Sequence, residues 1–302
     1  IFTKIIWMES ASSIKISHFK LIMLHRNQLI NIKGSKENYF LLATNTSEIV
    51  VSETIVRNVS LGSLIIANHC RQLTIQKVLI DQIEIGPKYQ SAIVTFAILK
   101  VGVYASKCKN VKGSILSFSQ FNHLILNESE FKSSATEKFG CILIFSDLRY
   151  PEEAIAIINS YFADCKTKQM GGAVSVVITH KEIFYEHNKT IKNLDNLNRN
   201  TSVTINIANS TFKSCMSEQK GGVIFVKSNM NSNRRHNYIN IFAVYSLFSL
   251  NTAGKVGGTI YGCGINLLSI AYCNFNQNRA DLEGGAIYVY NIKALFVTYS
   301  SF

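Results

Sequence analysis

Proline, helical periodicity and long apolar runs are all scarce in this chain of 302 residues. Only two prolines occur, Pro87 and Pro151. Because proline removes a hydrogen bond from a β-ladder, their scarcity favours a chain that is mostly paired strands. The longest apolar run, residues 92–99, ends at Lys100 and is shorter than the about 18 residues that a membrane helix needs. We expect it to be a buried strand.

The spacing typical of metal ligands is missing too. Seven cysteines and seven histidines occur, but no Cys-x-x-Cys pair, and the histidines do not have ligand spacing. A structural zinc site needs such clusters, so the sequence argues against one and indicates no cofactor.

Positive charge is the one strong bias in composition. There are 31 Lys and Arg against 19 Asp and Glu, a formal net charge of +12. Such a balance can indicate an acidic glycan, lipid head groups or nucleic acid as a partner. The basic residues are dispersed, however, and the densest cluster, 234–236, has no recognition helix or aromatic RNA-binding motif beside it. We expect a solvated basic surface and no nucleic acid partner.

A short sequence motif beginning with Phe recurs through the C-terminal half. A glycine stands nine residues after each Phe in the complete copies, and in four copies it opens a Gly-Gly pair followed by strand-forming residues. The repeated phenylalanines are Phe131, Phe162, Phe212, Phe248, Phe275 and Phe302, the last in a truncated copy. The glycines are Gly140, Gly171, Gly172, Gly221, Gly222, Gly257, Gly258, Gly284 and Gly285. A fixed internal spacing with variable length between copies is typical of one structural unit stacked on itself.

The unit is strand, turn, strand. Residues before each Phe alternate between apolar and polar, as in 205–212, and those after Gly-Gly are again strand formers. The intervals between successive phenylalanines are 31, 50, 36, 27 and 27 residues. The shortest is too short for a propeller blade but fits one coil of a parallel β-helix. We therefore predict an all-β parallel β-helix with a buried Phe ladder, a second ladder three residues later, and glycines at the corners.

The N-terminal half repeats this spacing without the Gly-Gly pair. An apolar residue at the Phe position, one five residues before it and a small or apolar one three after it recur around Val56, Ile80 and Cys108, and more weakly around Leu21. The sequence thus predicts one segment of a longer chain with about ten coils, degenerate over 1–124 and clear over 125–302. Polar insertions near 179–200 and 228–237 should protrude from the stack.

Cysteines and sequons favour a secreted protein. Cys165 and Cys215 both stand three residues after a repeat Phe, so on adjacent coils their Cα atoms would be about 5 Å apart, within disulfide reach. Small apolar fillers in a turn ladder are the alternative. Six Asn-x-Ser/Thr sequons occur, slightly more than composition predicts, and they are candidate glycosylation sites: Asn45, Asn58, Asn127, Asn188, Asn200 and Asn209.

Two of these motifs resemble a known repeat family. Phe275-Asn-Gln-Asn278 with Gly284-Gly-Ala-Ile287 is similar to the paired Phe-x-x-Asn and Gly-Gly-Ala-Ile repeats of the chlamydial polymorphic outer membrane proteins, and to β-helical surface proteins of protists. The resemblance covers about 125–302 and implies a pectin-lyase-like right-handed β-helix at the cell surface, acting in adhesion or assembly. It brings no catalytic residues. Cys165 and Cys215 depart from the family's Asn.

An enzyme of the same fold is the main alternative. Glycoside hydrolysis needs two carboxylates across the sugar, and lyases need clustered acids for Ca²⁺ and a basic residue. The chain has no Asp-Asp pair; its adjacent acids, Glu152 and Glu153, are expected in a loop, and Asp81 and Glu84 in one turn. We therefore favour a non-catalytic, extracellular or cell-surface structural or adhesive segment. Its expected partners are glycans, other surface proteins or further copies at the β-helix ends, with any membrane anchor outside this segment.

Overall fold

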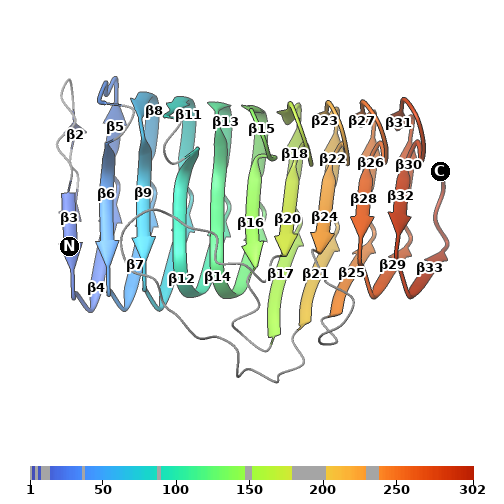
Figure 1. Cartoon of the computed structure of the whole chain (residues 1–302). Coiled ribbons are helices and arrows are strands. Elements are labelled where there is room, and N and C mark those ends of the chain that lie inside the picture. The colour runs from blue at the N-terminus through green and yellow to red at the C-terminus, as the bar shows by residue number, and fades with distance from the viewer. Residues whose placement is uncertain are drawn as a thin grey trace.

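The chain forms an all-β solenoid of parallel strands with about nine turns, in line with the expected count of about ten. The structure is a computed structural model and describes residues 2–3, 6–7, 14–35, 38–86, 90–146, 152–178, 202–228 and 238–302. The coils lie side by side along the axis from the N-terminus to the C-terminus (Figure 1). All pairings between the named strands are parallel, so each strand lies on its equivalent in the next coil. Both sheets run past residue 124 without interruption.

Each coil contributes strands to three faces. The first face consists of β3 (Ile14–Ser17), β6 (Tyr39–Thr44), β9 (Ser63–Asn68), the start of β12 (Ser91–Tyr104) and of β14 (Ser114–Asn127), β16 (Ile142–Ser146), β20 (Val174–Ile178), β24 (Ile224–Ser228), β28 (Ile260–Cys263) and β32 (Ile287–Tyr290). The second consists of β1 (Phe2–Thr3), β4 (Leu21–His25), β7 (Glu48–Ser52), β10 (Gln72–Gln76), the ends of β12 and β14, β17 (Glu152–Ile158), β21 (Ser202–Ala208), β25 (Tyr238–Val244), β29 (Leu267–Ala271) and β33 (Ala294–Thr298).

The third face is a separate sheet of 14 strands. Its longer elements are β2 (Ile6–Trp7), β5 (Gln28–Ile30), β8 (Ile55–Leu61), β11 (Leu79–Ile85), β13 (Lys107–Lys112), β15 (Glu130–Thr136), β18 (Tyr161–Ala163), β22 (Thr211–Lys213), β26 (Leu247–Ser249) and β30 (Asn274–Asn276). Four short strands complete it: β19 (Lys166–Thr167), β23 (Met216–Ser217), β27 (Thr252–Ala253) and β31 (Arg279–Ala280). Because β12 and β14 pass continuously from the first face to the second, those two faces form one sheet.

The repeat phenylalanines form one interior stack on the third face. Phe131, Phe162, Phe212 and Phe248 are fully buried, and neighbouring ring centroids lie 4.8, 4.9 and 5.1 Å apart. Phe275 continues the stack at 4.7 Å. Phe302 stacks on Phe275 but is 64% exposed, because it lies on the last coil described and no ring covers its outer face. The predicted ladder is therefore correct in register, and burial of its last member is wrong.

For the repeat spacing of the N-terminal half, the predicted register is correct in three coils and wrong in a fourth. Val56, Ile80 and Cys108 pair in succession and lead into Phe131. In the coil before them Leu29, rather than Leu21, pairs with Val56. The segment is so rich in Ile and Leu that two registers satisfy the apolar pattern, and only pairing with the neighbouring coil selects one of them.

The Gly-Gly pair serves two separate needs. The first glycine has φ near +64°, as at Gly171, Gly221 and Gly284, a left-handed conformation that favours glycine. The second allows close approach, since a Cβ on Gly222 would lie 2.1 Å from the carbonyl oxygen of Gly258 in the next coil. Gly140 departs from the prediction: its φ is not positive, and it is needed only because a Cβ there would lie 2.0 Å from the oxygen of Gly171.

Another corner repeats in every coil without glycine. Where the second face meets the third, one residue per coil takes φ near +50°, from Arg26 and Glu53 to Asn209 and Tyr245. A serine follows it in many coils. The hydroxyl of Ser210 accepts from the N–H of Ser160 at 3.2 Å and donates to the carbonyl of Ala208 at 2.8 Å, and Ser246 repeats this role one coil on. The serines thus satisfy backbone groups that a sharp corner would otherwise leave unpaired.

Parts of two predictions fall outside the described residues. These are the insertions at 179–200 and 228–237, of which only Ser228 is described. In the sequence, the first insertion lies between β20 and β21 and the second between β24 and β25.

Removing one ring from the middle of the Phe ladder should destabilise the fold strongly. Phe212→Ala deletes a fully buried ring with stacked neighbours on both sides, so we expect the free energy of unfolding to fall by about 3–5 kcal/mol. Denaturant unfolding of the whole chain would measure it. Phe242→Ala is the control, since its ring lies on the outer surface and is 36% exposed; equal losses would contradict an interior ladder.

The close-approach glycines provide a second test with a matched control. Gly222→Ala forces a methyl group against a neighbouring carbonyl, so we expect a loss of about 3 kcal/mol or more. Gly285→Ala in the last coil meets no atom closer than 3.5 Å and should change stability by less than about 1 kcal/mol. Similar unfolding midpoints for the two variants would show that the approach of the coils is not the constraint.

Candidate functional site

The acids singled out as enzyme candidates do not converge. Asp81 and Glu84 lie in strand β11 rather than in a turn. Asp81 is nearly buried and contacts Arg57 and Lys109 on the coils to either side, at 3.8 and 3.5 Å, and accepts from Asn110 at 2.9 Å. Among the described residues, no group of three or more His, Cys, Asp or Glu side chains is placed to hold a metal. Asp81 therefore neutralises the cations beside it.

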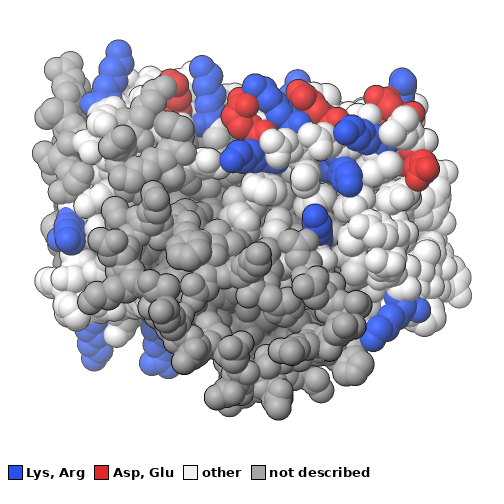
Figure 2. Space-filling model, viewed as in Figure 1, with Lys and Arg blue, Asp and Glu red and all other residues white. Residues whose placement is uncertain are grey.

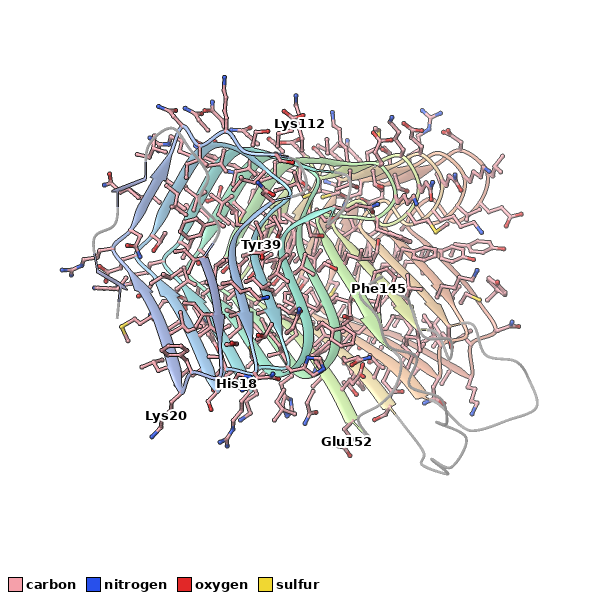
Figure 3. The ribbon with its side chains drawn as sticks, turned by 60° about the vertical axis from the view of Figure 1, so that its left-hand side comes forward. His18, Lys20, Tyr39, Lys112, Phe145 and Glu152 are labelled. Atoms are coloured by element: carbon pink, nitrogen blue, oxygen red, sulfur yellow. The ribbon has the colours of Figure 1, made fainter. Side chains whose placement is uncertain are left out.

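The adjacent acids Glu152 and Glu153 are also in a strand, β17, and not in a loop. Glu152 is exposed at the edge of the molecule (Figure 3), whereas Glu153 is 1% exposed. Successive strand residues point to opposite sides. The two carboxylates therefore cannot face each other across a sugar as a hydrolase pair would.

The outer surface of the third face carries charges of both signs on neighbouring coils. We call Arg57, Asp81, Lys107, Lys109, Glu130 and Lys132 the charged face. Glu130 contacts both Lys107, at 3.7 Å, and Lys132, and its hydrogen bond with Lys132 lowers the pKa of its carboxyl group. Figure 2 shows Lys and Arg interspersed with Asp and Glu along this edge, and Lys112 points away from it in Figure 3. Exposed pairs of this kind contribute at most about 1 kcal/mol each, so the face is solvated and adaptable.

The position three residues after each Phe has a defined hydrogen-bonding role. Asn251 Nδ2 donates to the carbonyl of Phe212 at 3.1 Å, and Asn278 Nδ2 donates to that of Phe248 at 2.9 Å. Asn251 Oδ1 also accepts from the backbone N–H of Cys215 at 2.9 Å. The asparagines thus join three coils through their side-chain amides.

The expected disulfide is absent from this structure. Cys165 and Cys215 are fully buried free thiols on neighbouring coils. Each points its Sγ at the carbonyl of the Phe one coil back, at 3.8 Å for Phe131 and 4.0 Å for Phe162, so the thiols replace the asparagines as weak donors. Burial raises the pKa of the Cys165 thiol, which keeps it protonated and unreactive.

Four of the six sequons are described, and their positions differ. Asn45 and Asn209 are exposed left-handed residues at corners of their coils, and Asn127 is half-buried at the end of β14. Asn58 is also exposed and left-handed, but it lies within β8 and its amide donates to Asn31 at 3.0 Å. Asn188 and Asn200 lie outside the described residues.

An exposed tyrosine ladder is the feature that the sequence analysis missed. Tyr245, Tyr272 and Tyr299 take the left-handed corner of the last three coils, and their rings stack at 4.9 and 5.0 Å. They stand three residues before Phe248, Phe275 and Phe302, so the repeat contains the pattern that would have revealed them.

Replacing the amide of Asn251 should be costly because several partners lose a bond at once. Asn251→Ala leaves the Phe212 carbonyl and the Cys215 N–H unpaired in the interior, so we expect a loss of about 2–4 kcal/mol of unfolding free energy. Asn276→Ala, an exposed asparagine one coil on, should cost less than about 0.5 kcal/mol. Thermal and denaturant unfolding would compare the two, and equal effects would argue against the amide ladder.

Comparison with known proteins gives a match to a family of repeats. The family model described as the Chlamydia polymorphic membrane protein repeat matches residues 272–290, which run from Tyr272 through Phe275 and the Gly284-Gly285 corner to the end of β32. No curated protein and no solved structure matches this chain. Among the described residues there is also no helix long and apolar enough to cross a membrane. The chain is a β-helix repeat protein that resembles the chlamydial polymorphic membrane proteins in its repeat.

Proposed function

We propose that this chain is a non-catalytic segment displayed outside the cell, where its solenoid holds a long surface out to partners. The observation that carries the proposal is the contrast between a constant interior and a variable exterior. Inside, one row holds Val56, Ile80, Cys108 and then phenylalanines, all buried except Phe302. Outside, the next row reads Arg57, Asp81, Lys109 and Lys132 in successive coils.

Two further observations support an extracellular role. The repeat at 272–290 matches a family whose description names it a membrane protein repeat. The sequons Asn45 and Asn209 present exposed side chains at corners and Asn58 presents one within β8, so an attached glycan would lie outside the interior. Together they favour a glycosylated stalk or adhesive fibre at the cell surface.

End-to-end association is part of the same proposal. Interior rows continue from coil to coil because like residues stack, as Leu268 does on Leu295 and Ile270 on Val297. A coil of another copy can extend such rows and pair with a strand edge in the same way.

Surface labelling of intact cells tests the proposal. In the cells that produce the protein, a membrane-impermeant amine reagent should modify Lys107 and Lys168, whose side chains are 68% and 60% exposed. Mass spectrometry of the full-length protein would locate the label, with an abundant cytosolic protein as the unlabelled control. Labelling only after permeabilisation would overturn the extracellular assignment.

A second measurement separates this proposal from the enzyme alternative. Incubation with polygalacturonate and other acidic polysaccharides, with and without Ca²⁺, should leave chain length unchanged. Cleavage that Glu153→Gln abolishes would establish a polysaccharide-active enzyme instead, because Glu153 is the acid with the most buried carboxylate among those considered.

A further inference from the structure

The tyrosine ladder occupies a backbone position that is unfavourable for large side chains. Tyr245, Tyr272 and Tyr299 have φ of +49°, +53° and +47°, a region that bulky residues rarely adopt. The two preceding coils place Asn159 and Asn209 at the same corner, and asparagine is better suited to it. Three successive coils have therefore exchanged a favourable residue for an aromatic one.

These rings are not buried as compensation. Tyr245 is 60%, Tyr272 48% and Tyr299 81% exposed. Since their faces stack on one another, they present ring edges and hydroxyl groups to solvent as a stripe along the solenoid axis.

The surface around the stripe carries no charge. We call it the tyrosine patch. It comprises the outward positions of the last three coils on either side of this corner: Phe242, Val244, Tyr245, Leu247, Ser269, Ala271, Tyr272, Asn274, Phe296, Thr298, Tyr299 and Ser301. None of these is Asp, Glu, Lys or Arg.

Earlier coils use the same rows differently. The corner row holds Arg26, Glu53, Lys77, Ala105 and Glu128 before it reaches Asn159 and Asn209. In a chain with a net charge of +12, the outward positions beside this corner are uncharged in the last five coils described, and the last three of these add the stacked tyrosines. Depletion of charge together with enrichment of tyrosine marks a binding surface rather than a solvated one.

Direction decides what kind of partner fits. The tyrosine rings repeat along the solenoid axis at 4.9 and 5.0 Å, so the patch offers the same groups at regular intervals in one direction. An extended ligand built of repeating units and lying along the axis can contact one ring after another.

We propose that the tyrosine patch binds a neutral glycan chain lying along the solenoid axis. Its hydroxyl and amide groups, from the tyrosines, Ser269, Asn274 and Thr298, match the hydroxyls of a sugar, and ring edges contact its C–H groups. Burying a charged ligand group against this uncharged surface would cost free energy, because the charge would lose its water without gaining a partner. An uncharged ligand avoids that cost. This inference deepens the proposed function, on which it rests, by naming one partner class.

Binding to defined sugars tests the assignment. The full chain, made in a host that adds no N-glycans so that Asn209 beside Tyr245 stays unmodified, is applied to immobilised neutral oligosaccharides of glucose, galactose, mannose and N-acetylglucosamine. Polygalacturonate and a sulfated glycan serve as acidic comparisons. We expect a neutral oligosaccharide to bind, and calorimetry on the tightest one to show about a tenfold or greater loss for Tyr272→Asn.

Tyr272→Asn separates binding from folding, because asparagine already occupies this corner at Asn159 and Asn209 and should leave the unfolding midpoint unchanged. Glu128→Asn, the same exchange in a charged coil, should bind as the parent does. Unchanged affinity in Tyr272→Asn would overturn the assignment, as would no binding at about 1 mM sugar. Preference for acidic glycans with salt-sensitive affinity, or binding of an extended peptide in place of any sugar, would overturn it too. If intact cells are labelled but no sugar binds, the glycan assignment is wrong and the proposed extracellular function stands. If a sugar binds but intact cells are not labelled, the extracellular function is wrong and the glycan assignment stands.

Discussion

Parallel stacking of one coil on the next is the constraint on which the whole molecule depends. Every backbone position has an equivalent about 4.8 Å above and below it, so any side chain that suits the interior can be repeated as a ladder. The ring separations of 4.7 to 5.1 Å along the phenylalanine stack follow directly from that pitch. The same pitch brings the carbonyl of Gly258 so close to Gly222 that no side chain fits between them.

The sequence predicts well those features in which the spacing between coils permits only one type of residue. A ring must lie on a ring and a glycine must face a carbonyl, so Phe and Gly-Gly recur at fixed spacing. The left-handed corner is different. Arg26, Lys77, Ala105 and Tyr245 all adopt it, because hydrogen bonds to the next coil impose the conformation whatever the side chain. A position that accepts such varied residues is not marked by a residue type of its own in the sequence.

The cysteines show how a correct position can leave the chemistry of a pair of residues open. Equal spacing after Phe162 and Phe212 does place Cys165 and Cys215 on neighbouring coils. What that row requires is a donor to the Phe carbonyl of the coil before, which Asn251 and Asn278 supply with an amide and the cysteines with a thiol. Proximity alone suggested a bond between the sulfurs, whereas the hydrogen-bonding need of the backbone explains both residue types.

Freedom outside the stack is what lets such a scaffold acquire function. Interior rows are held by burial and by the pitch, but an outward side chain can change without disturbing either, as the sequence Arg57, Asp81, Lys109 along one row illustrates. Ion pairs there are worth little, so they neither fix nor forbid a replacement. The tyrosine ladder is different from this neutral variation. Three adjacent coils place a large ring where the backbone disfavours it, expose it, and keep charge away from it. Stacking between the rings offsets part of that cost, but it does not explain the missing charges around them, and a bound ligand explains both.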